Sequence, residues 1–188
     1  MKRLPTPSQT VGPYFGQALP TPDGHAIAPA GHPDALTVHG YVHDGAGEPV
    51  PDALLEFWQP APDGSRTGAP GSLRRDPATG GHAGRDGVTF TGFGRAATDA
   101  DGHYTLRTLP PGGVPYLSVC VFARGLLHHL YTRAYMTWGQ ENEGDDPLLA
   151  ALPPERRETL RTRPEGPGVH RFDIHLQGAK ETVFLAFD

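Results

Sequence analysis

Hydrophobic and polar residues alternate with a period of two along several short segments of the chain. The strongest example is residues 115–124, where Leu117, Val119 and Val121 fall on one face. The opposite face of this segment is also mostly apolar until the segment ends at Arg124. This pattern predicts a strand inside a sheet, covered on both faces, that carries one cation at its end.

The same alternation predicts further strands, separated by turns rich in glycine, proline and aspartate. Residues 36–43 and 52–58 are predicted to pair as an antiparallel hairpin, and residues 89–98 and 103–109 as a second hairpin. Further strands are predicted at residues 126–136, 171–177 and 181–187.

A long loop and two short helices interrupt this series of strands. Residues 59–88 are full of Pro, Gly, Asp and Arg and predict a long loop, a feature that is usually functional or part of an interface. Asp146 followed by Pro147 is typical of a helix start, and residues 153–161 have an acidic start and a basic end, as a helix dipole favours. About eight short strands at hairpin spacing predict a mostly-β fold, an antiparallel β-sandwich with long loops and one or two short helices.

Composition narrows the class of protein. The 188 residues include 25 glycines and 21 prolines, which we assign to turns, and the net charge of −5 argues against a nucleic-acid surface. Cys120 is the one cysteine, so no internal disulfide can form, and its place in an apolar strand predicts a buried, inert thiol. The start of the chain lacks an apolar segment of the kind found in secretory signals, and no apolar run approaches the roughly 20 residues of a spanning helix. These features predict a cytoplasmic protein that contacts neither nucleic acid nor membrane.

No self-contained catalytic group is visible in the residues themselves. The chain has ten histidines but no His-x-His pair, and His39 and His43 share a strand face at a spacing that is poor for chelation. A single cysteine cannot build a thiolate zinc site, and Ser118 has no Gly-x-Ser-x-Gly elbow around it. Arg124 can pair with a carboxylate through two hydrogen bonds, or it can be a surface arginine in a loose salt bridge.

Several motifs nevertheless occur in one order along most of the chain. They are Thr6–Tyr14, Val38–Gly45, Ala53–Gln59, Phe93–Asp99, Gly102–Thr108 and His170–Ile174. Together they resemble the intradiol ring-cleavage dioxygenases. Four further segments resemble the non-metal alpha chains of the two-chain members of that family: Phe122–Gly125, Tyr131–Arg133, Arg156–Leu160 and Glu181–Phe184.

In that family, two tyrosines and two histidines hold an iron(III) ion, and the histidines form a His-x-His on the central strand. Here Tyr116 and Ser118 stand at the two histidine positions, and the segment between Gly113 and Pro115 is too short to carry the preceding ligand tyrosine. The resemblance therefore implies that this chain binds no metal and no cofactor. It implies a homologous iron-binding beta chain that holds the Fe(III) and forms an alpha–beta hetero-oligomer with this chain.

The resemblance also implies a reaction and a role. The reaction is the cleavage of protocatechuate (3,4-dihydroxybenzoate) by O2 to 3-carboxy-cis,cis-muconate, and this chain, inactive alone and without catalytic residues, shapes the substrate pocket of its partner. Thr10, Gly12 and Pro13 are implied to line that pocket, and Arg124 to contribute to substrate binding. Residues 1–35 are expected to form an N-terminal arm that packs on the partner, ahead of a sandwich domain at residues 36–188.

Two other interpretations are open at this point. The chain can be a transthyretin-like β-sandwich binding module without a catalytic partner, because its residues form no active site by themselves. It can also be a self-sufficient iron enzyme whose unusual ligands come from Tyr41, Tyr116, His39 and His43.

Overall fold

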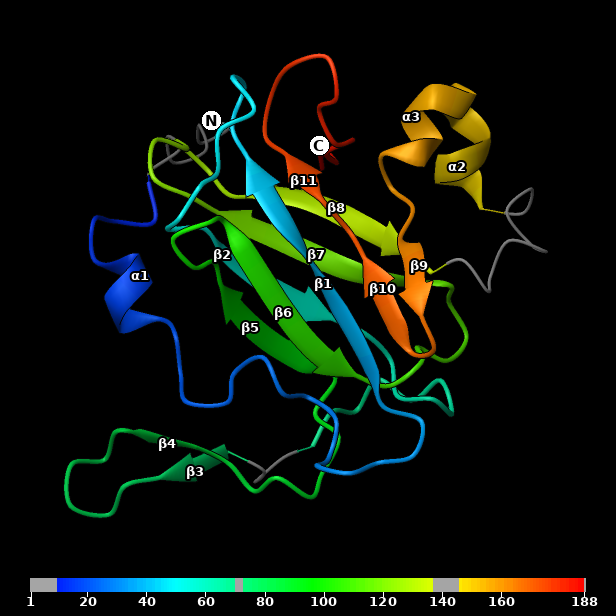
Figure 1. Cartoon of the computed structure of the whole chain (residues 1–188). Helices are drawn as coiled ribbons and strands as arrows, with labels where there is room; N and C mark the ends of the chain where they lie inside the picture. Colours follow the sequence, from blue (N-terminus) through cyan, green and yellow to red (C-terminus); the bar gives the residue numbers. More distant parts are fainter. Residues whose placement is uncertain (1–9, 70–72, 137–145, 188) are drawn as a thin grey trace, which may run out of the picture.

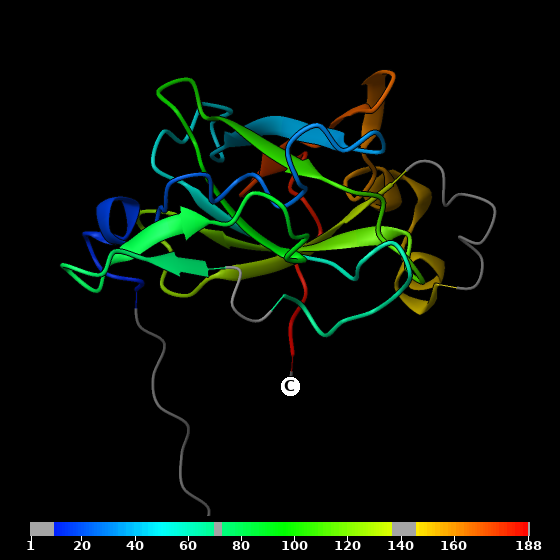
Figure 2. The ribbon, with the colours of Figure 1, turned by 90° about the horizontal axis from the view of Figure 1, so that it is seen from below.

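A computed structural model of the chain describes residues 10–69, 73–136 and 146–187. Two sheets pack face to face, and Figure 2 shows them as two layers. The first sheet contains β1 (Leu36–His43), β6 (His103–Thr108), β9 (Arg163–Gly166), β10 (Val169–Arg171) and β11 (Ile174–His175). The second sheet contains, in spatial order, β5 (Phe93–Ala97), β2 (Leu54–Trp58), β7 (Tyr116–Phe122) and β8 (Leu130–Tyr135). The predicted mostly-β sandwich is confirmed.

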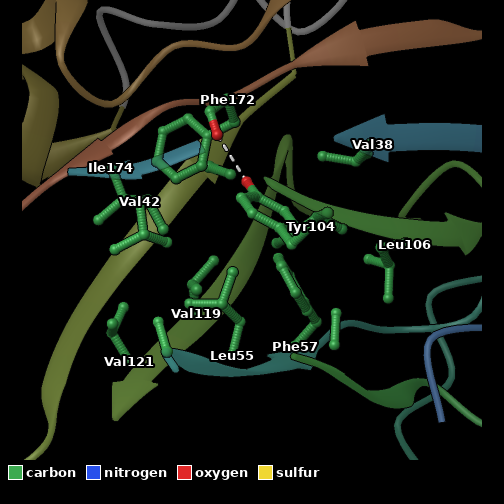
Figure 3. Packing of buried hydrophobic residues seen from close by; sticks show 14 of the residues in the cluster. Val38, Val42, Leu55, Phe57, Tyr104, Leu106, Val119, Val121, Phe172 and Ile174 are labelled. Carbon is green, nitrogen blue, oxygen red and sulfur yellow. Dashed lines mark hydrogen bonds between the residues drawn. The ribbon is translucent and has the colours of Figure 1, made fainter. Parts of the chain in front are cut away.

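The predicted central strand is β7. It pairs antiparallel with β2 on one edge and with β8 on the other, so it lies inside its sheet. Its inner residues Leu117, Val119 and Val121 are almost fully buried, because the first sheet covers them. The outer face is less covered than expected, since Tyr116 and Ser118 are only half-buried. Figure 3 shows the inner residues of both sheets filling the space between the layers.

Both predicted hairpins are wrong as strand pairs. β1 pairs with β6, and β2 pairs with β5 and β7, so the strands of each predicted hairpin belong to different sheets. Alternation in a sequence shows which side of a strand is buried, but it does not identify the neighbouring strand. All four strands face one core, and the turns at residues 44–53 and 98–102 carry the chain from one layer to the other.

The C-terminal third also differs from the sequence-based prediction. The predicted strand at residues 171–177 is one interrupted strand, β10 followed by β11, that runs parallel to β1 in the same register on both sides of the break. Residues 181–187 form no strand and contribute one isolated bridge, between Leu185 and Tyr131. The hairpin of β9 and β10 was not predicted, because the exposed residues of β9 show no alternation.

The predicted loop contains a short hairpin, and the structure has both predicted helices and one more. The predicted loop at residues 59–88 contains a small hairpin of β3 (Leu73–Arg75) and β4 (His82–Arg85), which Figure 1 shows extending away from the sandwich. Asp146 caps α2 (Pro147–Ala151) as predicted, since its Oδ1 accepts hydrogen bonds from two backbone amides. The second predicted helix is α3 (Pro154–Glu158), and a further helix, α1 (Phe15–Ala18), was not predicted. No helix in the described residues is long and apolar enough to cross a membrane.

One buried hydrogen bond ties the first sheet together at the break between β10 and β11. The Tyr104 hydroxyl donates to the Phe172 carbonyl oxygen at 2.6 Å, and both residues are 1% exposed (Figure 3). Gly40 pairs with Tyr104 across the sheet, and a Cβ at this position would lie 1.9 Å from the same carbonyl oxygen. Gly40 on β1 therefore allows the Phe172 backbone at the break to pack closely against β1. Burial raises the pKa of the Tyr104 hydroxyl well above its usual value.

This hydrogen bond predicts the effect of Tyr104→Phe on stability. The substitution leaves a buried carbonyl without its donor, and we expect the free energy of unfolding to fall by about 1–3 kcal/mol in urea denaturation. Tyr41→Phe is the matched control, because the Tyr41 hydroxyl makes no hydrogen bond with any described residue, and it should change stability by less than about 0.5 kcal/mol. Equal losses for the two variants would contradict the assigned role of Tyr104.

Two histidines of β10 and β11 predict how stability depends on pH. Burial lowers the pKa of His170, and burial together with the nearby His43 lowers the pKa of His175. The folded chain therefore binds these protons less readily than the unfolded chain. Stability should be complete above about pH 6.5, the usual histidine pKa, and should decline as the pH falls below it. His170→Gln and His175→Gln should each flatten this decline between about pH 7.5 and 5, whereas His82→Gln at an exposed position should leave its slope unchanged.

Candidate functional site

Arg124 lies two residues after the end of β7, and one carboxylate holds its side chain. The Arg124 Nε donates to Asp52 Oδ2 at 2.7 Å, while the arginine side chain is 83% exposed. The two terminal NH2 groups make no hydrogen bond with any residue in the described ranges. Asp52 thus orients the guanidinium through Nε, and the two terminal nitrogens stay available to a ligand. The sequence did not predict Asp52 as a partner of Arg124, because a partner that lies far away in the chain leaves no local signal.

A surface cleft of about 250 Å³ lies beside this arginine. Pro13 and Arg124 both line it, although they are far apart in the sequence. The cleft lies where the N-terminal segment passes the ends of β2, β5 and β7. Its remaining lining residues are Phe15, Gly16, Gln17, Pro51, Asp52, Ala53, Ala97 and Thr98.

The described part of the N-terminal segment is anchored to the sandwich of its own chain. Phe15 is buried, and Ile27 is fully buried in the core between the sheets. Arg95 of β5 adds a polar anchor, since it donates to the Leu19 carbonyl at 3.3 Å and forms an ion pair with Glu56 at 2.6 Å. These contacts fix the position of Pro13 at the cleft. Packing of this segment on a partner chain stays a prediction.

Thr10 and Gly12 lie outside the residues that line the cleft. Thr10 is exposed, and Gly12 has a φ of 95° with open space where a Cβ would stand. The structure therefore brings two of the four predicted substrate-binding residues together. Two apolar neighbours, Val11 and Tyr14, are exposed on the same segment, and Tyr14 is 72% exposed.

A second cavity, of about 340 Å³, lies on the outer face of the second sheet, and both Tyr116 and Ser118 line it. These are the positions at which the family resemblance places two iron-binding histidines. A neutral serine hydroxyl is a poor ligand for iron, and the cavity lining contains no histidine or carboxylate. Among the described residues, no three His, Cys, Asp or Glu side chains are grouped so as to hold a metal ion. The residues present do not fit an iron site.

The proposed ligands of a self-sufficient iron enzyme lie on opposite sides of the sandwich. His39, Tyr41 and His43 point outward from β1 in the first sheet, whereas Tyr116 points outward from β7 in the second sheet. The buried core separates the two faces, so these side chains cannot bind one ion.

The histidine of this set nearest to a carboxylate is already engaged by its neighbours. The His39 Nε2 lies 2.8 Å from Glu165 Oε2, and its Nδ1 lies 3.1 Å from His103 Nε2. The outward face of β1 therefore carries a hydrogen-bonded chain of side chains that satisfy one another.

Cys120 has the environment that the sequence predicted. It is a free, buried cysteine on β7, and burial, followed by the nearby Glu56 carboxylate, raises the pKa of its thiol to about 12. The thiol therefore stays protonated at neutral pH and is a poor nucleophile.

Comparison with known proteins places these features in a family. Residues 10–134 match the family model described as Dioxygenase. The protocatechuate 3,4-dioxygenase alpha chain of Burkholderia cepacia is 38% identical over 201 aligned positions, which cover 96% of each chain. The beta chain from the same organism is 28% identical over 79% of this chain and 67% of its own length.

Solved structures agree with this assignment. The dioxygenase domain of a dioxygenase and carbohydrate-binding protein fusion from Streptomyces sp. SirexAA-E is 31% identical, with a TM-score of 0.58, over 93% of this chain and 99% of that domain. The family model spans well over half of the sequence, and the alpha-chain similarity extends over nearly all of it. This chain therefore belongs to the intradiol dioxygenase family.

Proposed function

We propose that this chain is the non-metal alpha subunit of an iron-dependent intradiol dioxygenase that converts protocatechuate and O2 to 3-carboxy-cis,cis-muconate. Intradiol dioxygenases depend on iron, and in this proposal a homologous beta chain binds the Fe(III). Similarity to a protocatechuate 3,4-dioxygenase alpha chain over nearly the whole sequence supports the assignment. Similarity to a beta chain supports a homologous partner. A cytoplasmic location also stays a prediction.

The observation that carries the proposal is the cleft that Pro13 and Arg124 share. It combines a shaped wall from the N-terminal segment with a guanidinium whose terminal NH2 groups have no partner among the described residues. A guanidinium matches the planar geometry of a carboxylate and forms charge-assisted hydrogen bonds with it. Protocatechuate carries one ring carboxylate, which is the group that such a site recognises.

Asp52 makes Arg124 a better binding group than an unrestrained surface arginine. A long, exposed side chain loses conformational entropy when a ligand orders it. The 2.7 Å contact between Arg124 Nε and Asp52 Oδ2 restricts the guanidinium beforehand and leaves its terminal nitrogens available. Asp52 is therefore a positioning residue.

In this proposal the chain contributes binding and exclusion of water, not bond-making. The residues at its own Tyr116 and Ser118 positions do not fit iron, so the metal chemistry belongs to the partner. Pro13 and Arg124 form a wall that closes the partner's pocket from this side. Orienting a substrate and removing water from around it are recognised contributions to catalysis.

Two exposed apolar side chains lie close in the sequence to cleft residues and support a covering partner. Tyr14 lies next to Pro13 on the N-terminal segment, and Leu127 follows closely after Arg124 on the turn after β7, where it is 67% exposed. Large apolar side chains gathered near a binding cleft mark an interaction surface. We expect the beta chain to cover this surface and the remaining residues of the 1–35 arm.

Reconstitution with the partner tests the proposal. The chain should be purified alone, and also together with the candidate beta chain encoded beside it, and assayed for iron content and for oxygen uptake with protocatechuate. We expect a stable complex that contains iron and consumes oxygen, and no activity from this chain alone. Activity of the chain alone would contradict the proposal, and failure to form a complex with any such partner would favour a binding module instead.

Arg124→Ala provides a sharper test within the complex. Loss of a charge-assisted hydrogen bond of roughly 1.5–3 kcal/mol should lower kcat/KM for protocatechuate about ten- to a hundredfold. Catechol lacks the carboxylate, so its kcat/KM should change by less than about threefold. Arg74→Ala, at an exposed position on the distant hairpin, is the matched control and should affect neither substrate. Equal losses for both substrates would remove Arg124 from contact with the carboxylate.

A further inference from the structure

The cavity at Tyr116 and Ser118 has features of a binding site in its own right. Its volume of about 340 Å³ falls in the range of roughly 300–1,000 Å³ that is typical of small-molecule sites. It is separate from the cleft at Arg124, because Tyr116 and Ser118 lie in the first half of β7 while Arg124 follows its other end.

Aromatic side chains form the walls of this cavity. Trp58, Phe90 and Tyr116 all line it. Trp58 is 54% exposed although it belongs to β2, an inner strand of which it is the last residue. Of its two cross-strand neighbours only Phe93 is aromatic, at 4.3 Å between ring centroids. A large indole left open beside a cavity provides a flat apolar surface on which a planar ring can stack.

Three polar side chains of the cavity lining, Gln59, Ser65 and Thr91, already make hydrogen bonds within the chain, and three others make none with a described residue. Arg66 is the one charged residue among those that line it, and it makes no hydrogen bond or ion pair with any residue in the described ranges. The hydroxyl groups of Tyr116 and Ser118 likewise make no hydrogen bond with a described residue. A single positive charge beside two hydroxyl donors favours a ligand with one negative charge.

The floor of the cavity is held rigidly before any ligand binds. Gln59 donates through its Nε2 to the Leu109 carbonyl at 2.9 Å, and its Oε1 accepts from the Thr108 hydroxyl. The Gln59 backbone amide donates to the Gly92 carbonyl at 2.9 Å. Gly112 packs closely against the loop at residues 61–64, and a Cβ at this position would lie 2.2 Å from the Pro62 carbonyl oxygen. A preformed floor lowers the entropic cost of binding.

We propose that this cavity is a second ligand site that binds a planar aromatic monocarboxylate. The ring lies against Trp58 and Tyr116, and Arg66 pairs with the carboxylate. A guanidinium matches a carboxylate in shape, and one arginine balances one negative charge. The site is independent of the proposed function, because every residue that forms it belongs to this chain.

Ligand-observed ¹⁹F NMR of the full chain tests the site, with 4-fluorobenzoate as the probe and neutral 4-fluorobenzamide as its matched analogue. We expect saturable binding of the benzoate and weaker binding of the benzamide. Arg66→Ala should weaken the benzoate by about tenfold or more and leave the benzamide nearly unchanged. Arg74→Ala, an exposed arginine outside the cavity, should change neither affinity.

A second variant separates the cavity from the surface around it. Ser118→Leu fills the space below Trp58 and should abolish binding of both probes, while far-UV circular dichroism and the unfolding midpoint confirm that the variant is folded. Absence of saturable benzoate binding to the folded chain would overturn the proposal. So would unchanged binding in both Arg66→Ala and Ser118→Leu. The measurement needs neither iron nor a partner, so its outcome is distinct from that of the reconstitution.

Discussion

The pairing of β7 on both edges is the constraint on which the rest of the structure depends. β2 and β8 fix its position, and the first sheet buries its inner face. A strand held in this way is among the most rigid parts of a protein. It presents Tyr116 and Ser118 to one cavity and leads into Arg124 at another, so both candidate sites take their geometry from a single strand.

The cavity at Tyr116 and Ser118 and the cleft at Arg124 differ in the chemistry that they can support. At the positions where the family resemblance places metal-binding histidines, this chain has Tyr116 and Ser118, and the cavity around them has aromatic walls but no histidine or carboxylate to complete an iron site. At the end of the same strand, an arginine steadied by Asp52 faces outward beside exposed apolar side chains. In the proposed function, the first arrangement makes the chain depend on a partner for its metal chemistry. In the proposed function, the second provides a carboxylate-binding wall for the partner's pocket.

The sequence was most informative where a property depends on neighbouring residues. Alternation located β7 and its buried face, and the Asp146–Pro147 pair located a helix start. Contacts between distant segments were not accessible in this way. The hairpins were assigned to the wrong partners because strands of both sheets face one core, and the Asp52–Arg124 pair and the cleft beside Pro13 arise only when the chain folds. The assignment of Arg124 to substrate binding rests on the family resemblance and stays a prediction, since its local pattern fits an ordinary surface arginine equally well.

The central claim is that this chain closes a substrate pocket whose metal belongs to another chain. A crystal structure of the two-chain complex with bound protocatechuate tests it most directly. We predict that the Arg124 terminal nitrogens lie within about 3.2 Å of the substrate carboxylate, a hydrogen-bonding distance. We also predict that Pro13 contacts the same substrate, and that the iron is ligated only by residues of the partner. An iron ligand from this chain, or an Arg124 that faces solvent away from the substrate, would contradict the account.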